Sequence, residues 1–145
     1  MIAAALAVAF AVAQLKPVGL TNPPSNGELS APSEVNAILR RSCYDCHSNE
    51  TRWPWYSHVA PSSWMVLHDV ERGRKEVNFS QWGGYYPRTR QRKLEWMRRA
   101  LEDRVMPPES YTLMHPGARL SADDRARLQR WIETALTGNA NGQSQ

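Results

Sequence analysis

Two cysteines, Cys43 and Cys46, with His47 directly after the second, restrict the possible folds of this chain more than any other feature. They are its only cysteines, and they form a C-x-x-C-H run. Two thiols at this spacing can add across the two vinyl groups of a haem, and the adjacent histidine can then reach the iron. In a helix, positions i, i+3 and i+4 share one face, with Cβ atoms about 5–6 Å apart. The run therefore predicts one covalently attached haem c per chain, held by Cys43, Cys46 and His47.

A redox-active dithiol and half of a zinc site are the alternative interpretations of the same spacing. A zinc site needs four ligands, yet no second C-x-x-C or H-x-x-x-H run follows in the sequence. A dithiol motif usually stands next to a βαβ unit, and the chain shows little strand pattern. The haem interpretation is favoured, and an exported thiol–disulfide protein without haem stays open as the alternative.

Residues 1–15 are almost wholly apolar, with Gln14 as their one polar side chain. Spanning a bilayer takes about 20 apolar residues, so this run is short for a transmembrane helix. Its length suits the apolar region of a signal peptide, and Ala11-Val12-Ala13 resembles a cleavage site, although no Lys or Arg precedes it. We expect a signal peptide or membrane anchor here rather than a buried N-terminal helix. The protein is then periplasmic, or anchored in the inner membrane and facing the periplasm.

The rest of the chain divides into three parts. Residues 16–32 contain four prolines and two glycines, a composition that predicts a linker. Residues 33–138 form the expected haem-binding domain. Residues 139–145 are polar and follow Gly138, so we expect a disordered tail.

Apolar residues at helical spacing, in segments separated by loops, predict an all-α domain. In the last helix Asp124 completes a capping box with Ser121, and Gly138 stands where a C′ glycine belongs. Some of the six tryptophans are expected to line the flat apolar haem. The expected helices follow an N-cap at Ser33 (carrying Val35, Ile38 and Leu39), follow an N-cap at Ser62 or Ser63 (Trp64, Leu67, His68 and Glu71, ending near Gly73), open at Thr89 (Leu94, Met97 and Leu101) and follow an N-cap at Ser121 (Leu128, Trp131, Ile132, Ala135 and Leu136).

The second axial ligand of the iron decides what such a haem does. Met106 is the favoured candidate, because two prolines follow it and prolines hold a chain in a stiff, extended conformation. His68 is the main alternative, since it shares a helical face with Trp64 and would give a bis-histidine haem. Met97 falls on a core stripe, and an open site without a second protein ligand is also possible. The remaining candidates are Met65, Met114, His58 and His115.

The net charge of +4 is concentrated in one segment. Residues 88–104 carry seven Arg or Lys side chains against three acidic ones. Such a segment is either a solvated helix face, a docking surface for an acidic redox partner, or a partner for the haem propionates. Nucleic acid is a poor fit for an exported haem protein.

The residues around the cysteines resemble the bacterial haem-binding domain family, small exported proteins related to cytochromes c. The resemblance covers about residues 33–136, and its most specific stretch runs from Cys43 to Trp82. It implies a helical cytochrome c-like fold, a covalent haem on Cys43, Cys46 and His47, and an N-terminal hydrophobic anchor that matches residues 2–15. In cytochromes c generally, a Met in a proline-bearing loop is the distal ligand, and Met106 occupies that place. The runs that carry the resemblance are Ser42–Ser57, Val59–Pro61, His68–Arg74, Asn78–Trp82, Met106–Pro108 and His115–Ser121.

These observations favour a monohaem c-type cytochrome that transfers single electrons in the periplasm, with iron held by His47 and Met106. We expect an electron carrier rather than a catalyst. The alternative is a haem peroxidase or small-ligand sensor with an open distal site, where Tyr85, Tyr86 and His68 could supply polar groups.

Overall fold

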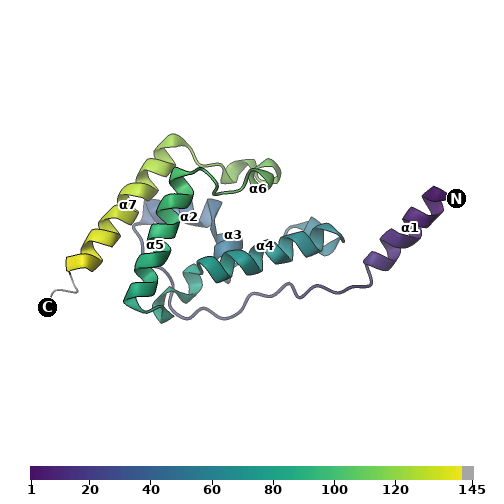
Figure 1. Cartoon of the computed structure of the whole chain (residues 1–145), viewed down its shortest axis with the longest axis horizontal. Coiled ribbons are helices and arrows are strands. Elements are labelled where there is room, and N and C mark those ends of the chain that lie inside the picture. The colour runs from purple at the N-terminus through teal and green to yellow at the C-terminus, as the bar shows by residue number, and fades with distance from the viewer. Residues whose placement is uncertain (142–145) are drawn as a thin grey trace.

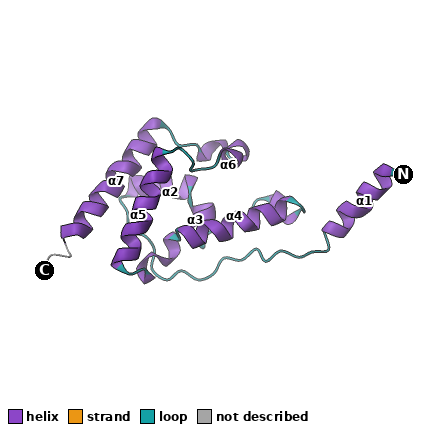
Figure 2. Cartoon of the chain, in the orientation of Figure 1, coloured by secondary structure: helices purple, strands orange, loops and turns teal. Residues whose placement is uncertain are grey.

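The part of the chain that this computed structural model describes, residues 1–141, contains helices and loops but no strand (Figure 2). This confirms the expected fold class. The α-helices are α1 (Ile2–Ala13), α2 (Ser33–Ser42), α3 (Tyr44–His47), α4 (Ser62–Glu76), α5 (Pro87–Glu102), α6 (Glu109–Met114) and α7 (Ala122–Asn141). Three short 3-10 helices lie between them: η1 (Trp55–His58), η2 (Phe79–Gly84) and η3 (Pro116–Ala118).

The core lies where α2, α5 and α7 meet. Helix α5 packs along α7, and α2 also contacts α7 (Figure 1). The stripe expected on α4 is wrong, because Trp64 is 36% exposed and His68 is also exposed. The other three apolar stripes expected from sequence face this core and are confirmed. Its buried members include Val35, Ile38 and Leu39 of α2, Leu94, Met97 and Leu101 of α5, and Leu128 and Ile132 of α7.

The capping box at the start of α7 is confirmed and also joins two helices. The Asp124 backbone N–H donates to Ser121 Oγ at 3.0 Å, and the Ser121 N–H donates to Asp124 Oδ2 at 2.9 Å. The same carboxylate oxygen accepts a hydrogen bond from the Arg41 guanidinium of α2 at 2.8 Å. These bonds lower the pKa of Asp124. The bond from Arg41 also holds the start of α7 next to the end of α2.

Two expected helix ends are wrong. Ser33 is the first residue of α2 and makes no capping bond, because Pro32 occupies the N-cap position. Helix α7 continues past Gly138 to Asn141, since Gly138 does not take the positive φ that a C′ glycine requires. The expected tail of residues 139–145 is therefore helical in its first part, and residues 142–145 lie outside the described part of the chain.

The second half of the segment expected to be a linker is part of the packed domain. The Asn26 N–H donates to the Ser80 carbonyl at 2.7 Å, and the Leu29 N–H donates to the Phe79 carbonyl at 2.9 Å. Leu29 is buried in the core. Gly27 has a φ of 82°, and a Cβ there would lie 2.9 Å from the Gly83 Cα. Residues 24–31 thus run closely along η2 rather than hanging free.

Helix α1 lies at one end of the molecule, far from α5 and α7 (Figure 1). None of its residues is buried. Within residues 1–141, no helix has the length and apolar character needed to cross a membrane.

Candidate haem site

The cysteine–histidine run starts at Cys43, where α2 ends, and continues as the separate short helix α3. The Cys43 N–H ends α2 by donating to the Leu39 carbonyl at 2.8 Å. The Cys43 carbonyl then accepts the N–H groups of Cys46 and His47, at 3.2 and 2.9 Å. Cys43 itself has a φ of −131°, outside the helical range. Cys46 and His47 still follow one helical turn after Cys43, as the spacing predicts.

Gly73 allows α4 to pack directly against this turn. A Cβ at position 73 would lie 2.5 Å from the carbonyl oxygen of Cys46. The expectation that Gly73 ends its helix is wrong, because α4 continues to Glu76. The glycine instead provides the close approach of α4 to the haem-binding motif.

His47 is buried and oriented by a backbone carbonyl. Its ring Nδ1 lies 3.1 Å from the Val77 carbonyl just beyond α4. A carbonyl only accepts, so Nδ1 carries the proton and Nε2 keeps its lone pair. Burial lowers the pKa of His47, which favours the neutral imidazole that binds iron. In metal sites, a hydrogen bond from the ring nitrogen that does not bind the metal typically orients the histidine.

Both thiols are free in the structure and unsuited to dithiol chemistry. Burial raises the pKa of Cys43 and of Cys46 to about 12 in each case. A redox-active C-x-x-C pair needs the opposite, a lowered pKa that supplies thiolate at neutral pH.

Cys43, His47 and Met106 line the same cavity. Its walls come from α2, α5 and α7 and from the segment between α4 and α5, and no charged side chain is among them. Trp96 is the one tryptophan of the wall, and its ring centroid lies 5.9 Å from that of His47. Cys46 does not line this cavity. The other lining residues are Leu39, Val77, Phe79, Met97, Ala100, Leu101 and Leu128.

The residues that line the cavity match the chemistry of a haem, but the cavity is smaller than a haem. An apolar macrocycle with an iron at its centre needs apolar walls, a neutral imidazole and a second soft ligand, and the cavity offers all three. Its volume is about 40 Å³, which is smaller than a porphyrin. The side chains that line it must therefore move apart to admit the haem.

Met106 is placed by the way α5 ends. Arg104 takes a φ of 56°, and the Val105 N–H donates back to the Ala100 carbonyl at 3.1 Å. This is a Schellman motif, which normally uses glycine at the left-handed position. From α7, Arg125 donates to the Met106 carbonyl at 3.3 Å. The turn and this bond direct the half-buried Met106 side chain into the cavity.

The other candidate ligands lie elsewhere, with one exception. Met97 is buried and lines the cavity beside Met106. His68 is exposed on α4 and does not line it. His115 stacks on Tyr111, with ring centroids 4.3 Å apart. His58, Met65 and Met114 are exposed.

Tyr111 makes a contact that sequence reasoning did not find. Its hydroxyl donates to Asp45 Oδ2 at 2.8 Å, so helix α6 is joined to the middle of the cysteine–histidine run. Burial, and then the bond to Asp45, raise the pKa of Tyr111, which keeps the hydroxyl protonated as a donor. In the sequence, Asp45 between the two cysteines is the one sign of such a contact.

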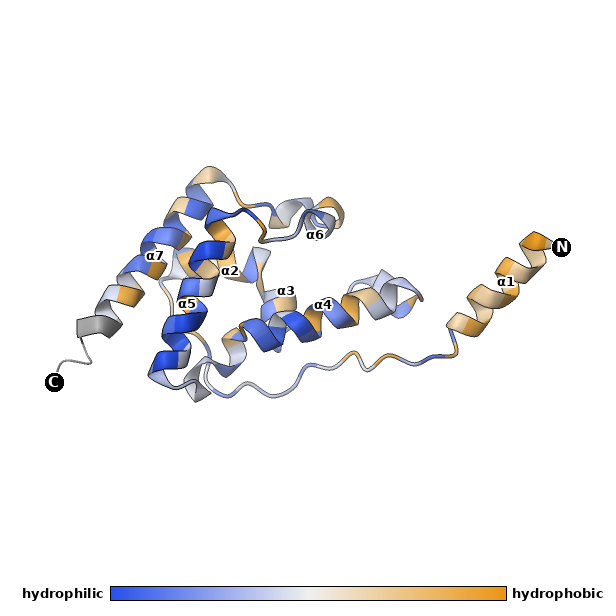
Figure 3. Ribbon diagram, viewed as in Figure 1, coloured by the Kyte–Doolittle hydropathy of each residue, from blue (hydrophilic) through white to orange (hydrophobic). Residues whose placement is uncertain are grey.

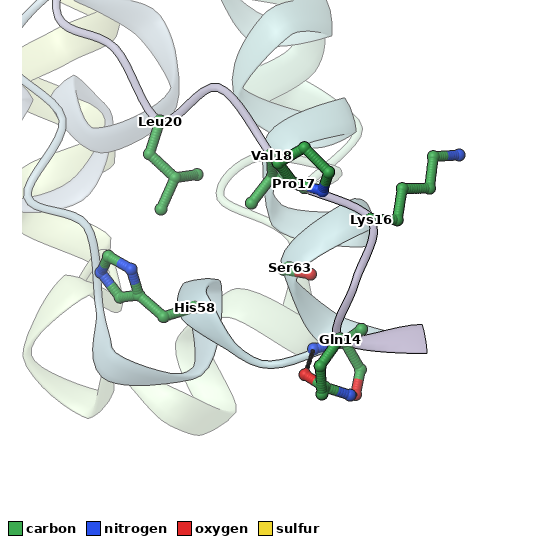
Figure 4. A pocket seen from close by; sticks show the side chains of 8 residues that line it. Gln14, Lys16, Pro17, Val18, Leu20, His58 and Ser63 are labelled. Carbon is green, nitrogen blue, oxygen red and sulfur yellow. Dashed lines mark hydrogen bonds between the residues drawn. The ribbon is translucent and has the colours of Figure 1, made fainter. Parts of the chain in front are cut away.

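A larger hollow of about 370 Å³ lies away from this site, between residues 14–20 and the start of α4 (Figure 4). His58 is its one side chain able to bind iron, and neither cysteine lines it. The hollow therefore does not match the haem site expected from sequence.

The basic segment forms most of α5. Lys93 donates to the Glu76 carbonyl, Arg90 donates to the Gly83 carbonyl at 3.0 Å, and Arg98 pairs with Glu102 at 2.6 Å. Arg92 and Arg99 are exposed on the same helix. Part of the positive charge thus holds the fold together, and part faces solvent.

Comparison with known proteins gives a family and one distant relative. One similar protein is the cytochrome c peroxidase Ccp of Escherichia coli (strain K12), 25% identical over 115 residues. The match covers 72% of this chain but only 24% of that protein, so the chain spans about a quarter of the relative's length. No solved structure matches the chain. The sequence model of the haem-binding domain family matches residues 4–134. The chain therefore belongs to the haem-binding domain family.

Proposed function

We propose that this haem-binding protein attaches one haem c through Cys43 and Cys46 and transfers single electrons through it. The observation that carries the proposal is that Cys43 and His47 of one run and Met106 from a distant loop line one uncharged cavity. A haem bound in this cavity would supply an iron that accepts and releases one electron.

Each residue of the site has a distinct part. The thiols of Cys43 and Cys46 form thioether bonds, and His47 offers Nε2 while Val77 holds its Nδ1 proton. The Met106 thioether would be the second protein ligand of the iron, and His/Met ligation would raise the reduction potential. Trp96 and the aliphatic walls exclude water from the iron. The exposed arginines of α5 attract an acidic redox partner.

A haem peroxidase or small-ligand sensor is the second candidate. The similarity to a protein named cytochrome c peroxidase favours it, as does the partial exposure of Met106 on its loop. A ligand that leaves the iron would open the distal site. We prefer the carrier, because a thioether already lies in the cavity with His47.

Covalent attachment also bears on where the protein works. Haem c is joined to proteins outside the bacterial cytoplasm, and residues 1–15 have the composition of a signal peptide or anchor. We therefore place the domain in the periplasm, free or held at the inner membrane.

Two measurements on protein made with the c-type maturation system test this function. The intact mass under denaturing conditions should exceed the chain mass by one haem, and Cys43→Ala with Cys46→Ala should abolish the increment. The Met106→Ala variant should have a lower reduction potential than the parent, while the conservative Met97→Leu variant keeps it. If Met97→Leu lowers the reduction potential and Met106→Ala does not, Met97 rather than Met106 is the distal ligand.

A further inference from the structure

Helix α1 is apolar on every side, and nothing in the described structure covers it. Residues 2–13 carry no charge, and none of them is buried. Figure 3 shows the helix as hydrophobic along its whole length. A helix that is hydrophobic all round is typical of apolar surroundings, whereas a helix that docks in a protein groove has one apolar stripe.

Gln14 attaches α1 to the rest of the molecule. Its side-chain Nε2 donates to the Ala60 carbonyl at 3.2 Å, and its Oε1 accepts the Ala60 N–H at 2.9 Å (Figure 4). The amide therefore pairs with both backbone groups of one residue, between η1 and α4. This pairing holds α1 next to the junction between η1 and α4. Any surface that covers α1 must therefore also contact that junction.

The junction has the composition of a membrane–water interface. Residues 53–67, which we call the η1–α4 corner, contain no Asp, Glu, Lys or Arg. Trp55 is 75% exposed, Met65 67% and Trp64 36%. The Lys16 ammonium lies 5.5 Å from the centroid of the Trp64 ring. Tryptophan is enriched at the level of lipid headgroups, and lysine there can bury its stem while its charge stays in water.

We propose that the η1–α4 corner rests on the surface of a lipid bilayer while α1 lies in the apolar layer. The two uncharged surfaces adjoin, so a single broad apolar partner covers both. Helices α5 and α7, which form walls of the haem site, lie at the opposite end of the molecule (Figure 1). The bilayer would therefore leave the haem site open to a partner.

Amide hydrogen exchange of the full chain with and without vesicles of phosphatidylethanolamine and phosphatidylglycerol tests the proposal. We expect vesicles to slow exchange in residues 55–67 and to leave residues 88–102 of α5 unchanged. Vesicle binding without protection of the corner would overturn the proposal, because α1 alone would then account for it. Absence of binding would overturn it as well.

Matched variants identify the residues and the occupant. Trp55→Ser with Met65→Ser should weaken partitioning onto these vesicles about tenfold, because large apolar side chains lose their burial. Tyr86→Ser with Leu113→Ser removes side chains that are 81% and 69% exposed and should leave partitioning unchanged. If the first pair instead abolishes a dimer seen without lipid, the occupant is a second copy and the proposal fails. Vesicle binding is read without any haem signal, so this test is independent of the proposed electron transfer.

Discussion

At the scale of single residues, Gly73 shows how closely the haem motif is enclosed. The backbone of Cys46 lies so near α4 that any side chain at position 73 meets a carbonyl oxygen 2.5 Å away. A backbone atom cannot rotate aside as a side chain can, so α3 and α4 would have to separate. The same contact fixes Cys46 one turn after Cys43, and it places Val77 next to His47 at the end of α4.

Replacing Gly73 by Ala should destabilise the protein by about 1–3 kcal/mol, the usual cost of forcing atoms into a packed site. Gly138→Ala is the matched control, because it is also a helical glycine but has no atom within 4 Å of the added Cβ. This control should stabilise α7 by up to about 1 kcal/mol, since Ala favours helix over Gly. Urea unfolding of both variants gives the comparison, and equal effects would contradict the role of Gly73.

The residue scale also shows what the sequence could and could not reveal. The C-x-x-C-H run and the Met-Pro-Pro run are local patterns, so their residues could be identified without the fold, and the structure brings Cys43, His47 and Met106 together. Val77, Trp96 and Tyr111 carry no such local signal. Their roles depend on contacts between segments far apart in the chain, as between Tyr111 and Asp45.

At the scale of elements, the short helix α6 matters because it follows Met106 directly. Its Tyr111 donates to Asp45 of α3, so the helix that follows Met106 and the helix that carries His47 share a hydrogen bond. Helix α6 was not expected from sequence, because a six-residue helix has too few residues for a periodic pattern. The longer helices α2, α4, α5 and α7 were predicted, because each shows more than one repeat of its apolar stripe.

The Tyr111→Phe variant should lose about 1–2 kcal/mol of stability, because a partly buried bond to a carboxylate is removed. It should also bind carbon monoxide faster in the reduced state, since the Met106 loop is held less firmly. Tyr86→Phe is the control, because Tyr86 is 81% exposed. Absorption followed for hours after mixing with carbon monoxide, and urea unfolding, test the two effects, and an unchanged carbon monoxide rate would show that the bond does not restrain the loop.

At the scale of the whole molecule, the cavity lined by His47 and Met106 shares α5 with the basic surface, and the apolar end occupies a separate region. Helix α5 has its apolar stripe in the core and its exposed arginines toward solvent, beside the haem site. Helix α1 and the η1–α4 corner lie at the other end (Figure 1). The overall class could be predicted from helical periodicity. The path of residues 24–31 along η2 could not, because its bonds are made by backbone groups of a proline-rich segment.

The position of charge on α5 leads to a prediction about electron transfer. Arg92→Glu with Arg99→Glu should slow oxidation of the reduced protein by the ferricyanide anion at low salt, and added salt should remove the difference. Arg72→Glu with Lys75→Glu on α4 changes the net charge equally and is the control. Stopped-flow rates that fall by the same factor in both variants would mean that net charge, rather than the α5 surface, guides the acceptor.

The absorption spectrum of the full chain with its haem, oxidised and reduced, before and after carbon monoxide, tests the central claim most directly. His47 and Met106 together predict a six-coordinate low-spin haem, with the weak far-red band of Met bound to ferric iron. Carbon monoxide should leave the reduced spectrum unchanged over minutes. A high-spin spectrum, or an immediate shift with carbon monoxide, would contradict the Met106 assignment and favour the peroxidase or sensor.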